Sequence, residues 1–418
     1  MNRPGPSAIR LSARVFLAAA AIAMARAGAD PAATPANSGQ PMADRTAGGL
    51  IKVGENLTSR GDYPTAESAY RQVIDRADFG LGDQKTALLA LAHLYRKAGT
   101  LTKAVAVYEK FLAEFPDDPR VPEAFLDLGR TLRDMGAYKL AINRFYSVIN
   151  STLNVSTQDF ERYALLAKTA QFEIAQTYYE AGDYAEAGRF FTRVRLLDLA
   201  PADLARAYFM SGCAEQQAGD LDTAVTTLKS FLEQWPNDPN GPEARYVLAE
   251  ALEGLNRPKE ALAVTLSLLN AEHNLVASDP RRWAYWQRRT GNQLANRFFQ
   301  NGDALNALVI YRCLAGLSPD PSWRLPVTYQ IGLCYERLYQ TDQAKAAYQS
   351  IIDGAKAAGD AAGTPVVSEL SEMAAWRMAH LAWRDDANRR LTKLLDPGIV
   401  PAPTPAAADK SDASSPAS

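Results

Sequence analysis

Residues 172–194 read FEIAQTYYEAGDYAEAGRFFTRV. Two runs of helix-favouring residues flank Gly182, and glycine readily takes the positive φ that ends a helix. Ala175 and Ala187 lie twelve residues apart on either side of this turn. Because small side chains at both points let two antiparallel helices approach closely, the stretch predicts a helix–turn–helix unit.

The same unit recurs along the chain at a nearly fixed interval. Eight alanines occupy the position of Ala187, namely Ala66, Ala104, Ala141, Ala187, Ala224, Ala261, Ala307 and Ala344. The residue twelve positions earlier, here called the small site, is always Gly or Ala: Gly54, Ala92, Gly129, Ala175, Gly212, Ala249, Ala295 and Gly332. Six copies also keep glycine at the turn, and two weaker copies lack it. Such a register predicts stacked helical hairpins.

Bulky residues follow each alanine at helical spacing. Four positions later stand Tyr70, Tyr108, Phe145, Phe191, Leu228, Thr265, Tyr311 and Tyr348. Three positions further on stand Val73, Phe111, Val148, Val194, Phe231, Leu268, Leu314 and Ile351. This spacing places alanine, ring and aliphatic side chain on one face of the second helix, which predicts that this face packs on the first helix.

The register resembles the tetratricopeptide repeat family over about residues 47–360. The resemblance implies an all-α, right-handed α-α superhelix of about eight repeats. Insertions of about nine residues are expected near residues 150–159 and 270–279. We expect residues 366–396 to form a capping helix pair with a polar outer face, which closes a solenoid over residues 47–396.

A second resemblance comes from the ends of two units. Residues 108–119 read YEKFLAEFPDDP, and a related copy spans residues 231–244. This motif looks like bacterial envelope repeat proteins, namely the TolA-binding periplasmic coordinator and the outer-membrane-assembly lipoprotein of the barrel-insertion machine. The N-terminal coiled coil of the first and the lipidated cysteine of the second are not found in this sequence. The resemblance implies a role in envelope or outer-membrane assembly.

The first residues match a secretory signal. Arg3, Arg10 and Arg14 precede an apolar run over residues 15–25, and Ala25-Arg26-Ala27 follows. The run is shorter than the roughly 20 residues that cross a bilayer. We therefore expect residues 1–27 to be a signal peptide cleaved after Ala27, which predicts a periplasmic or secreted protein.

Two further segments are rich in Pro, Ala and small polar residues. Residues 28–46 are expected to be a flexible leader, and residues 397–418 a disordered tail, because neither can bury enough apolar surface to offset chain entropy. The sequence holds no other apolar stretch of transmembrane length, so no transmembrane span is expected.

Composition excludes several functions. The 418 residues carry a formal net charge of −2, which argues against a nucleic-acid partner. Three Cys and three His are too few for a disulfide framework or a Cys/His metal domain. The known phosphate-loop, nucleophile-elbow, zinc and dinucleotide fingerprints are missing, so we expect no catalytic, cofactor-binding or metal-binding residue and no enzyme activity. Cys313 and Cys334 could form a disulfide or could be two small buried side chains.

The tetratricopeptide resemblance also implies a partner-binding groove on the first helices. Its residues lie one and four positions after each small site and three positions before it. The candidates are Arg96, Arg130, Arg133, Phe172, Tyr179, Phe209, Tyr246, Glu250 and Glu253. This order, from basic through aromatic to acidic, suits an extended peptide or a protein partner. The alternative is that the rings are core between units and the arginines are solvated.

From this groove we expect Arg130→Glu combined with Arg133→Glu to weaken partner capture without lowering the melting temperature. Another class of function rests on residues 279–289, DPRRWAYWQRR, where basic and aromatic residues alternate. That segment predicts a glycan- or peptidoglycan-binding module of the envelope, unless Trp283 and Trp286 pack into the second insertion and leave the arginines in solvent.

Overall fold

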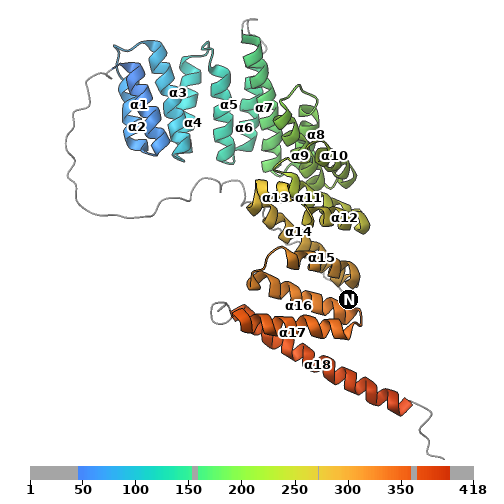
Figure 1. The fold of residues 1–418 in the computed structure, drawn as a ribbon. Helices are drawn as coiled ribbons and strands as arrows, with labels where there is room; N and C mark the ends of the chain where they lie inside the picture. The colour runs from blue at the N-terminus through green and yellow to red at the C-terminus, as the bar shows by residue number, and fades with distance from the viewer. Residues whose placement is uncertain (1–45, 153–158, 272, 359–364, 396–418) are drawn as a thin grey trace, which may run out of the picture.

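The computed structural model describes residues 46–152, 159–271, 273–358 and 365–395. These residues form eighteen helices and no strand, which confirms the all-α prediction. Figure 1 shows the helices following one another along an elongated array, with α1 at one end and α18 at the other. The array changes direction around α7, as a superhelical solenoid does.

Sixteen of the helices form the eight predicted pairs. The first helices are α1 (Ala47–Arg60), α3 (Leu81–Lys97), α5 (Val121–Asp134), α7 (Phe160–Glu180), α9 (Pro201–Ala218), α11 (Gly241–Gly254), α14 (Pro280–Gln300) and α16 (Pro321–Arg337). The second helices are α2 (Tyr63–Ile74), α4 (Leu101–Glu114), α6 (Tyr138–Thr152), α8 (Tyr184–Val194), α10 (Leu221–Gln234), α12 (Pro258–Leu269), α15 (Ala304–Gly316) and α17 (Thr341–Ala358). Each first helix packs on its own second helix, and α1, α5, α9, α11 and α16 also contact the helix that begins the next unit.

The two predicted insertions lie between units. The first spans the end of α6 and the start of α7, and residues 153–158 within it lie outside the described residues. The second forms the short helix α13 (His273–Ser278) and precedes α14, which has 21 residues. The expected signal peptide, the leader up to residue 45 and the tail also lie outside the described residues, whereas Thr46 caps α1.

The prediction of a helix pair at the C-terminal end is wrong. Residues 365–395 form one helix of 31 residues, α18 (Pro365–Leu395). Neither Gly nor Pro occurs between residues 366 and 395, so nothing in that stretch stops the helix. The outer face is not polar either, because Trp376 and Trp383 are 62% and 66% exposed.

The turns inside the pairs follow the predicted register. All six turn glycines have positive φ values, between 73° and 86°. In the two copies without glycine the same position is held by Asn256 and Tyr339, with φ values of 56° and 58°. The backbone therefore turns in the same left-handed way in all eight units, even where the side chain disfavours it.

The contact inside each pair is a bulky side chain seated on a small site. All eight registered alanines are fully buried. A Cβ added to Gly129 would lie 2.5 Å from the ring of Phe145, sixteen residues later. The same holds at 2.5–2.6 Å for three other pairs, Gly54 with Tyr70, Gly212 with Leu228, and Gly332 with Tyr348. The small sites thus leave room for the bulky side chain that lies sixteen residues later on the second helix, at what we call the ring position.

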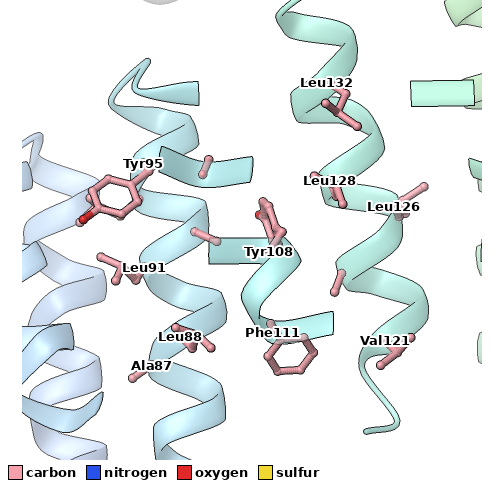
Figure 2. Close-up of a cluster of buried hydrophobic side chains, with 14 of the residues drawn as sticks. Ala87, Leu88, Leu91, Tyr95, Tyr108, Phe111, Val121, Leu126, Leu128 and Leu132 are labelled. Atoms are coloured by element: carbon pink, nitrogen blue, oxygen red, sulfur yellow. The ribbon is translucent and has the colours of Figure 1, made fainter. Parts of the chain in front are cut away.

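The second helix also contacts the next unit. Figure 2 shows Tyr108 and Phe111 of α4 between side chains of α3 and α5. Both rings have no exposed surface. The core therefore runs along the solenoid from unit to unit, in place of a single globular centre.

This core is interrupted where unit six meets unit seven. The ring position of unit six is Thr265, which is fully buried, and its hydroxyl has no hydrogen-bond partner among the described residues. Gln287 and Thr290 of α14 are also buried there, and Gln287 donates to the carbonyl oxygen of Leu268 at 3.0 Å. The apolar clusters before and after this junction are separate.

We predict that Gly129→Ala destabilises the protein by about 2 kcal/mol, because the new methyl group collides with a ring that has no room to move. Urea denaturation followed by circular dichroism measures the change. Gly316→Ala is the matched control, since a Cβ there meets no atom within 4 Å and helix propensity improves. Equal midpoints for Gly129→Ala and wild type would contradict the seating contact.

Candidate functional site

The basic end of the predicted groove is paired within the chain. Arg96 of α3 binds Asp134 of α5, with 3.0 Å between Nη2 and Oδ2. His93, three residues earlier, lies 3.3 Å from a carboxylate oxygen of Asp127 and 3.3 Å from the hydroxyl of Tyr108. The charge of Arg96 is thus balanced by the next unit.

Arg130 and Arg133 meet at one carboxylate of the following unit. Arg130 donates through Nε to Oε1 of Glu173 at 2.7 Å, and Arg133 donates through Nη1 to Oε2 at 2.5 Å. The side chains of Arg133 and Glu173 are only 9% and 10% exposed. The structure brings these two predicted groove arginines together, with Glu173 between them.

The pKa of Glu173 reflects this pairing. Burial by itself would raise the pKa of the carboxyl group, but the charges of Arg133 and Arg130 and their hydrogen bonds hold it below the ordinary value of 4.5. Replacing both arginines by glutamate would bury Glu173 beside two more carboxylates. We therefore expect this double variant to have a lower melting temperature, in place of the unchanged one expected from the sequence.

The aromatic candidates of unit four are partly buried in α7. Phe172 makes an edge contact with Phe191 at a centroid distance of 5.6 Å, and the guanidinium of Arg206 lies 4.6 Å from its ring centroid. Tyr179 contacts Tyr184 edge-on at 5.3 Å. Both rings therefore pack within the solenoid and keep only part of their surface in solvent.

The aromatic candidates of units five and six are more deeply buried. Phe209 is 6% exposed and packs on Phe231 at a centroid distance of 5.7 Å. Tyr246 is 8% exposed and packs on Trp286 at 5.0 Å. Burial raises the pKa of Tyr246 to about 12. These contacts agree with the interpretation of the rings as core between units.

The acidic end of the predicted groove is also paired with the next unit. Glu250 accepts a hydrogen bond from Nε2 of Gln293 at 2.8 Å, and Glu253 forms an ion pair with Arg297. Together with Tyr246 these residues line a small pocket between α11 and α14. The nine predicted residues are therefore spread along five first helices, from α3 to α11.

The pairing follows a register that the sequence analysis missed. Residues one position after a small site contact residues two positions before the next small site: His93 with Asp127, Arg130 with Glu173, and Glu250 with Gln293. Complementary polar residues at these two positions of successive units could have revealed the pairs. We call this arrangement the inter-unit ladder.

The ladder reaches α14 from α11, but among the described residues no pair in this register joins α14 to α16, where the surface is hollowed. A cavity of about 560 Å³ is lined by one face of α14, namely Arg281, Ala284, Tyr285, Arg288, Arg289 and Asn292. A second cavity of about 190 Å³ adjoins it at Asn292 and is lined by Asn292, Asn296, Tyr311, Ser322, Trp323, Pro326, Val327 and Gln330. We call the two cavities together the α14–α16 hollow.

Three arginines of this hollow form no ion pair within 4 Å among the described residues, although the charge of Arg288 acts on Asp320 and that of Arg289 on Glu243. The guanidinium of Arg288 lies 4.5 Å from the ring centroid of Trp323, and its Nε lacks a hydrogen-bond partner. Arg289 donates to two phenol oxygens, that of Tyr285 at 2.8 Å and that of Tyr246 at 3.4 Å. Arg281 is exposed at the outer end. The hollow is therefore positively charged, in contrast to the ladder.

The polar groups deeper in the hollow are amides. The side chains of Asn292 and Gln330 make no hydrogen bond to another described residue, whereas Oδ1 of Asn296 accepts one from Tyr311 at 2.5 Å. An amide side chain both donates and accepts, as a peptide backbone does. The hollow combines amide side chains that have no hydrogen-bond partner among the described residues with arginines that form no ion pair there.

The basic and aromatic segment 279–289 supplies much of this hollow, but its tryptophans do not line it. Trp283 is 4% exposed, and Trp286 lies against Tyr246. Arg282 donates to Asn240 at 2.6 Å and pairs with Glu243 at 3.3 Å. The two tryptophans thus pack into the protein, and Tyr285 is the exposed ring of the segment.

None of the three cysteine thiols has a lowered pKa that would make it a reactive nucleophile. Cys213, Cys313 and Cys334 are all free, so the pair Cys313 and Cys334 is not bonded. Burial raises the pKa of each thiol, that of Cys334 to about 12. In the part of the chain that the structure describes, no cluster of three or more His, Cys, Asp or Glu could hold a metal ion. None of the described helices is apolar enough over a sufficient length to cross a membrane.

Comparisons with known proteins agree with the repeat register. One tetratricopeptide repeat family model matches residues 54–119 and 209–273, and another matches residues 169–196 and 327–353. These four matched segments of the chain are therefore similar to tetratricopeptide repeats. A search of curated proteins finds no match.

Solved structures of low sequence identity also match this chain. The C-terminal part of a tetratricopeptide repeat protein from Cytophaga hutchinsonii is 14% identical over 66% of this chain and 98% of its own, with a TM-score of 0.49. A tetratricopeptide repeat protein from Parabacteroides merdae is 14% identical over 69% of this chain and 98% of its own, with a TM-score of 0.40. The apo quorum sensor NprR from B. thuringiensis is 15% identical over 73% and 86%, with a TM-score of 0.43.

We predict that Glu173→Gln destabilises the protein at neutral pH by roughly 2–3 kcal/mol, because two arginines lose their shared carboxylate. Since the pKa of Glu173 is lower in the folded state, its contribution is complete above pH 4.5 and is lost as the pH falls further. Urea denaturation across this range should show the two proteins converging at low pH.

Glu109→Gln is the matched control, since Glu109 is 53% exposed and pairs with Arg144 at 3.5 Å. Its effect should stay within about 0.5 kcal/mol at every pH. A Glu173→Gln variant with wild-type stability at pH 7 would show that the buried pair contributes nothing.

Proposed function

We propose that this protein is an exported, non-catalytic scaffold that binds an extended, acidic segment of a protein partner in the α14–α16 hollow. One observation carries this proposal. Asp134 pairs with Arg96 and Glu173 with Arg130 and Arg133, while Arg281, Arg288 and Arg289 form no ion pair within 4 Å among the described residues. A carboxylate of the partner would form with these arginines the ion pairs that Asp134 and Glu173 form with the other three.

The amides support a peptide as the occupant. The side chains of Asn292 and Gln330 match the donors and acceptors of an extended backbone, and Trp323 offers an apolar wall beside Arg288. A sugar ligand would gain less, because Trp283 and Trp286 are packed in the protein and offer no face for stacking. The hollow therefore favours an acidic peptide over a glycan.

A pair of labelled peptides tests the hollow. The mature protein is titrated with an extended peptide of alternating Ala and Glu, and with the same peptide carrying Lys in place of Glu, while fluorescence anisotropy is recorded. We predict that the acidic peptide binds and the basic one does not. Arg288→Ala should raise the dissociation constant about tenfold, which is the effect of losing one charge-assisted contact.

Arg189→Ala provides the control, since Arg189 is 70% exposed on α8 and forms a surface pair with Glu186. It should leave the dissociation constant unchanged. Equal binding of both peptides, or equal effects of the two variants, would reject the hollow as the site. Capture of purified peptidoglycan fragments in place of the acidic peptide would favour the glycan-binding module.

The envelope location is part of the proposal and rests on residues 1–27. An apolar run after three arginines, closed by Ala-Arg-Ala, is what the export machinery and the signal peptidase recognise. The kinship with envelope repeat proteins rests on residues 108–119 and 231–244. Together these features support a place in an envelope complex, where the scaffold takes part in envelope or outer-membrane assembly.

We predict that the mature chain begins at Gly28 and is found in the periplasmic or secreted fraction of a bacterial host. N-terminal sequencing of the purified protein measures this directly. Ala27→Asp should block cleavage and leave a longer precursor, because the peptidase accepts only small side chains there. An intact chain that starts at Met1 in the cytosol would contradict the export proposal and leave the peptide proposal standing.

A further inference from the structure

The last helix carries an apolar stripe on its exposed face. Met373, Trp376 and Trp383 are 48%, 62% and 66% exposed, and Leu394 is 82% exposed. His380 lies between the two tryptophans, with centroid distances of 5.5 and 5.8 Å and nearly parallel rings. The stripe therefore includes a stack of three aromatic rings that points away from the solenoid.

The opposite face fixes the rotation of α18. Leu370, Ala374 and Leu381 are buried in the cluster that joins α18 to α16 and α17. Lys345 of α17 pairs with Asp385 at 2.6 Å, and Glu336 of α16 pairs with Arg377 at 3.4 Å. Because both apolar and charged contacts hold this face, the tryptophans cannot turn inward.

A terminal unit of a solenoid normally presents a polar outer face, which keeps the stack soluble. Here two tryptophans that are about two-thirds exposed leave roughly 300 Å² of ring surface in water, comparable to the largest apolar patch of an ordinary monomer. Figure 1 shows that α18 also extends past the end of α17, so its final turns have no neighbour in the solenoid.

We propose that the exposed stripe of α18 binds the same stripe of a second copy of this chain, with the two helices antiparallel about a two-fold axis. The proposal is independent of the peptide site. Such an interface uses one patch twice and therefore closes at a dimer. It also covers the tryptophans of both copies.

The spacing of the stripe residues favours a second copy of the chain as the binding partner. Met373, Trp376, His380, Trp383, Ala387 and Leu394 of the stripe fall in a series whose intervals alternate between four and three in either direction, with the charged Glu369 and Arg390 at the remaining positions of the series. Alternation of three and four is the pattern of a helix–helix seam. In the antiparallel pair Trp376 meets Ala387 of the other copy, a large residue opposite a small one, and His380 meets Trp383.

The charges beside the stripe are complementary in the same arrangement. Glu369 and Glu372 lie at the start of α18, whereas Arg390 and Lys393 lie near its end. Antiparallel pairing places Glu372 of one copy beside Lys393 of the other, twice across the axis. Neither residue has an ion-pair partner among the described residues, so both are free for this contact.

Sedimentation equilibrium of the mature protein over a dilution series tests the pairing. Wild type should reach twice the mass of one chain, and tryptophan emission should shift to shorter wavelength on association. Trp383→Glu should raise the dissociation constant about 100-fold, because a central ring is replaced by a charge. Leu196→Glu is the matched control, since Leu196 is 84% exposed at the end of α8, far from α18 in the chain.

A charge swap separates antiparallel pairing from other associations. Glu372→Lys and Lys393→Glu should each weaken the dimer about tenfold, because each places like charges together twice. The double variant restores opposite charges across the axis and should regain wild-type affinity. Circular dichroism should show the same helix content for all of these variants, since the changed residues are exposed.

Three results would overturn the proposal. One is a wild-type chain that stays monomeric throughout the dilution series. Another is a dimer that survives Trp383→Glu, or one that the double charge variant fails to restore. The last is a monomer that becomes a dimer when residues 396–418 are deleted, which would show that the chain's own tail covers the stripe.

Discussion

The seating of a bulky side chain on a glycine or alanine sixteen residues earlier is the contact on which the whole array depends. At Gly129 and Phe145 the two helices approach so closely that one methyl group would not fit. Tight packing of this kind fixes the angle within each hairpin, and the repetition of the angle sets the path of the solenoid. Everything on the surface, including the ladder and the hollow, inherits its geometry from this contact.

Local spacing in the sequence was sufficient to predict the hairpins. The registered alanines, the small sites and the turn glycines are all properties of one unit, and the left-handed turns at Asn256 and Tyr339 follow from the register even without glycine. The last helix was mispredicted because its sequence does not follow the register of the repeats. Residues 366–396 have no unit to compare with, and the absence of Gly and Pro was a weaker signal than the expectation of a pair.

The site was harder to predict than the fold, because it depends on contacts between units. Position in the register placed Arg130 and Arg133 on the expected helix, but it did not show that Glu173 of the next unit lies between them. Glu173 is 43 and 40 residues away from the two arginines in the sequence, so only the three-dimensional structure shows that it pairs with them. The sequence shows the basic and aromatic segment 279–289, but only the structure distinguishes the buried Trp283 and the packed Trp286 from the arginines that face the hollow.

The junction at Thr265 has a consequence for cooperativity. Apolar clusters on its two sides are separate, and buried hydroxyl and amide groups replace the ring or leucine that fills this position in the other units. In a linear array, such a weak link lets the parts before and after it open independently. A peptide held by α14 and α16 would then protect the C-terminal units from opening and leave the first six units to their own equilibrium.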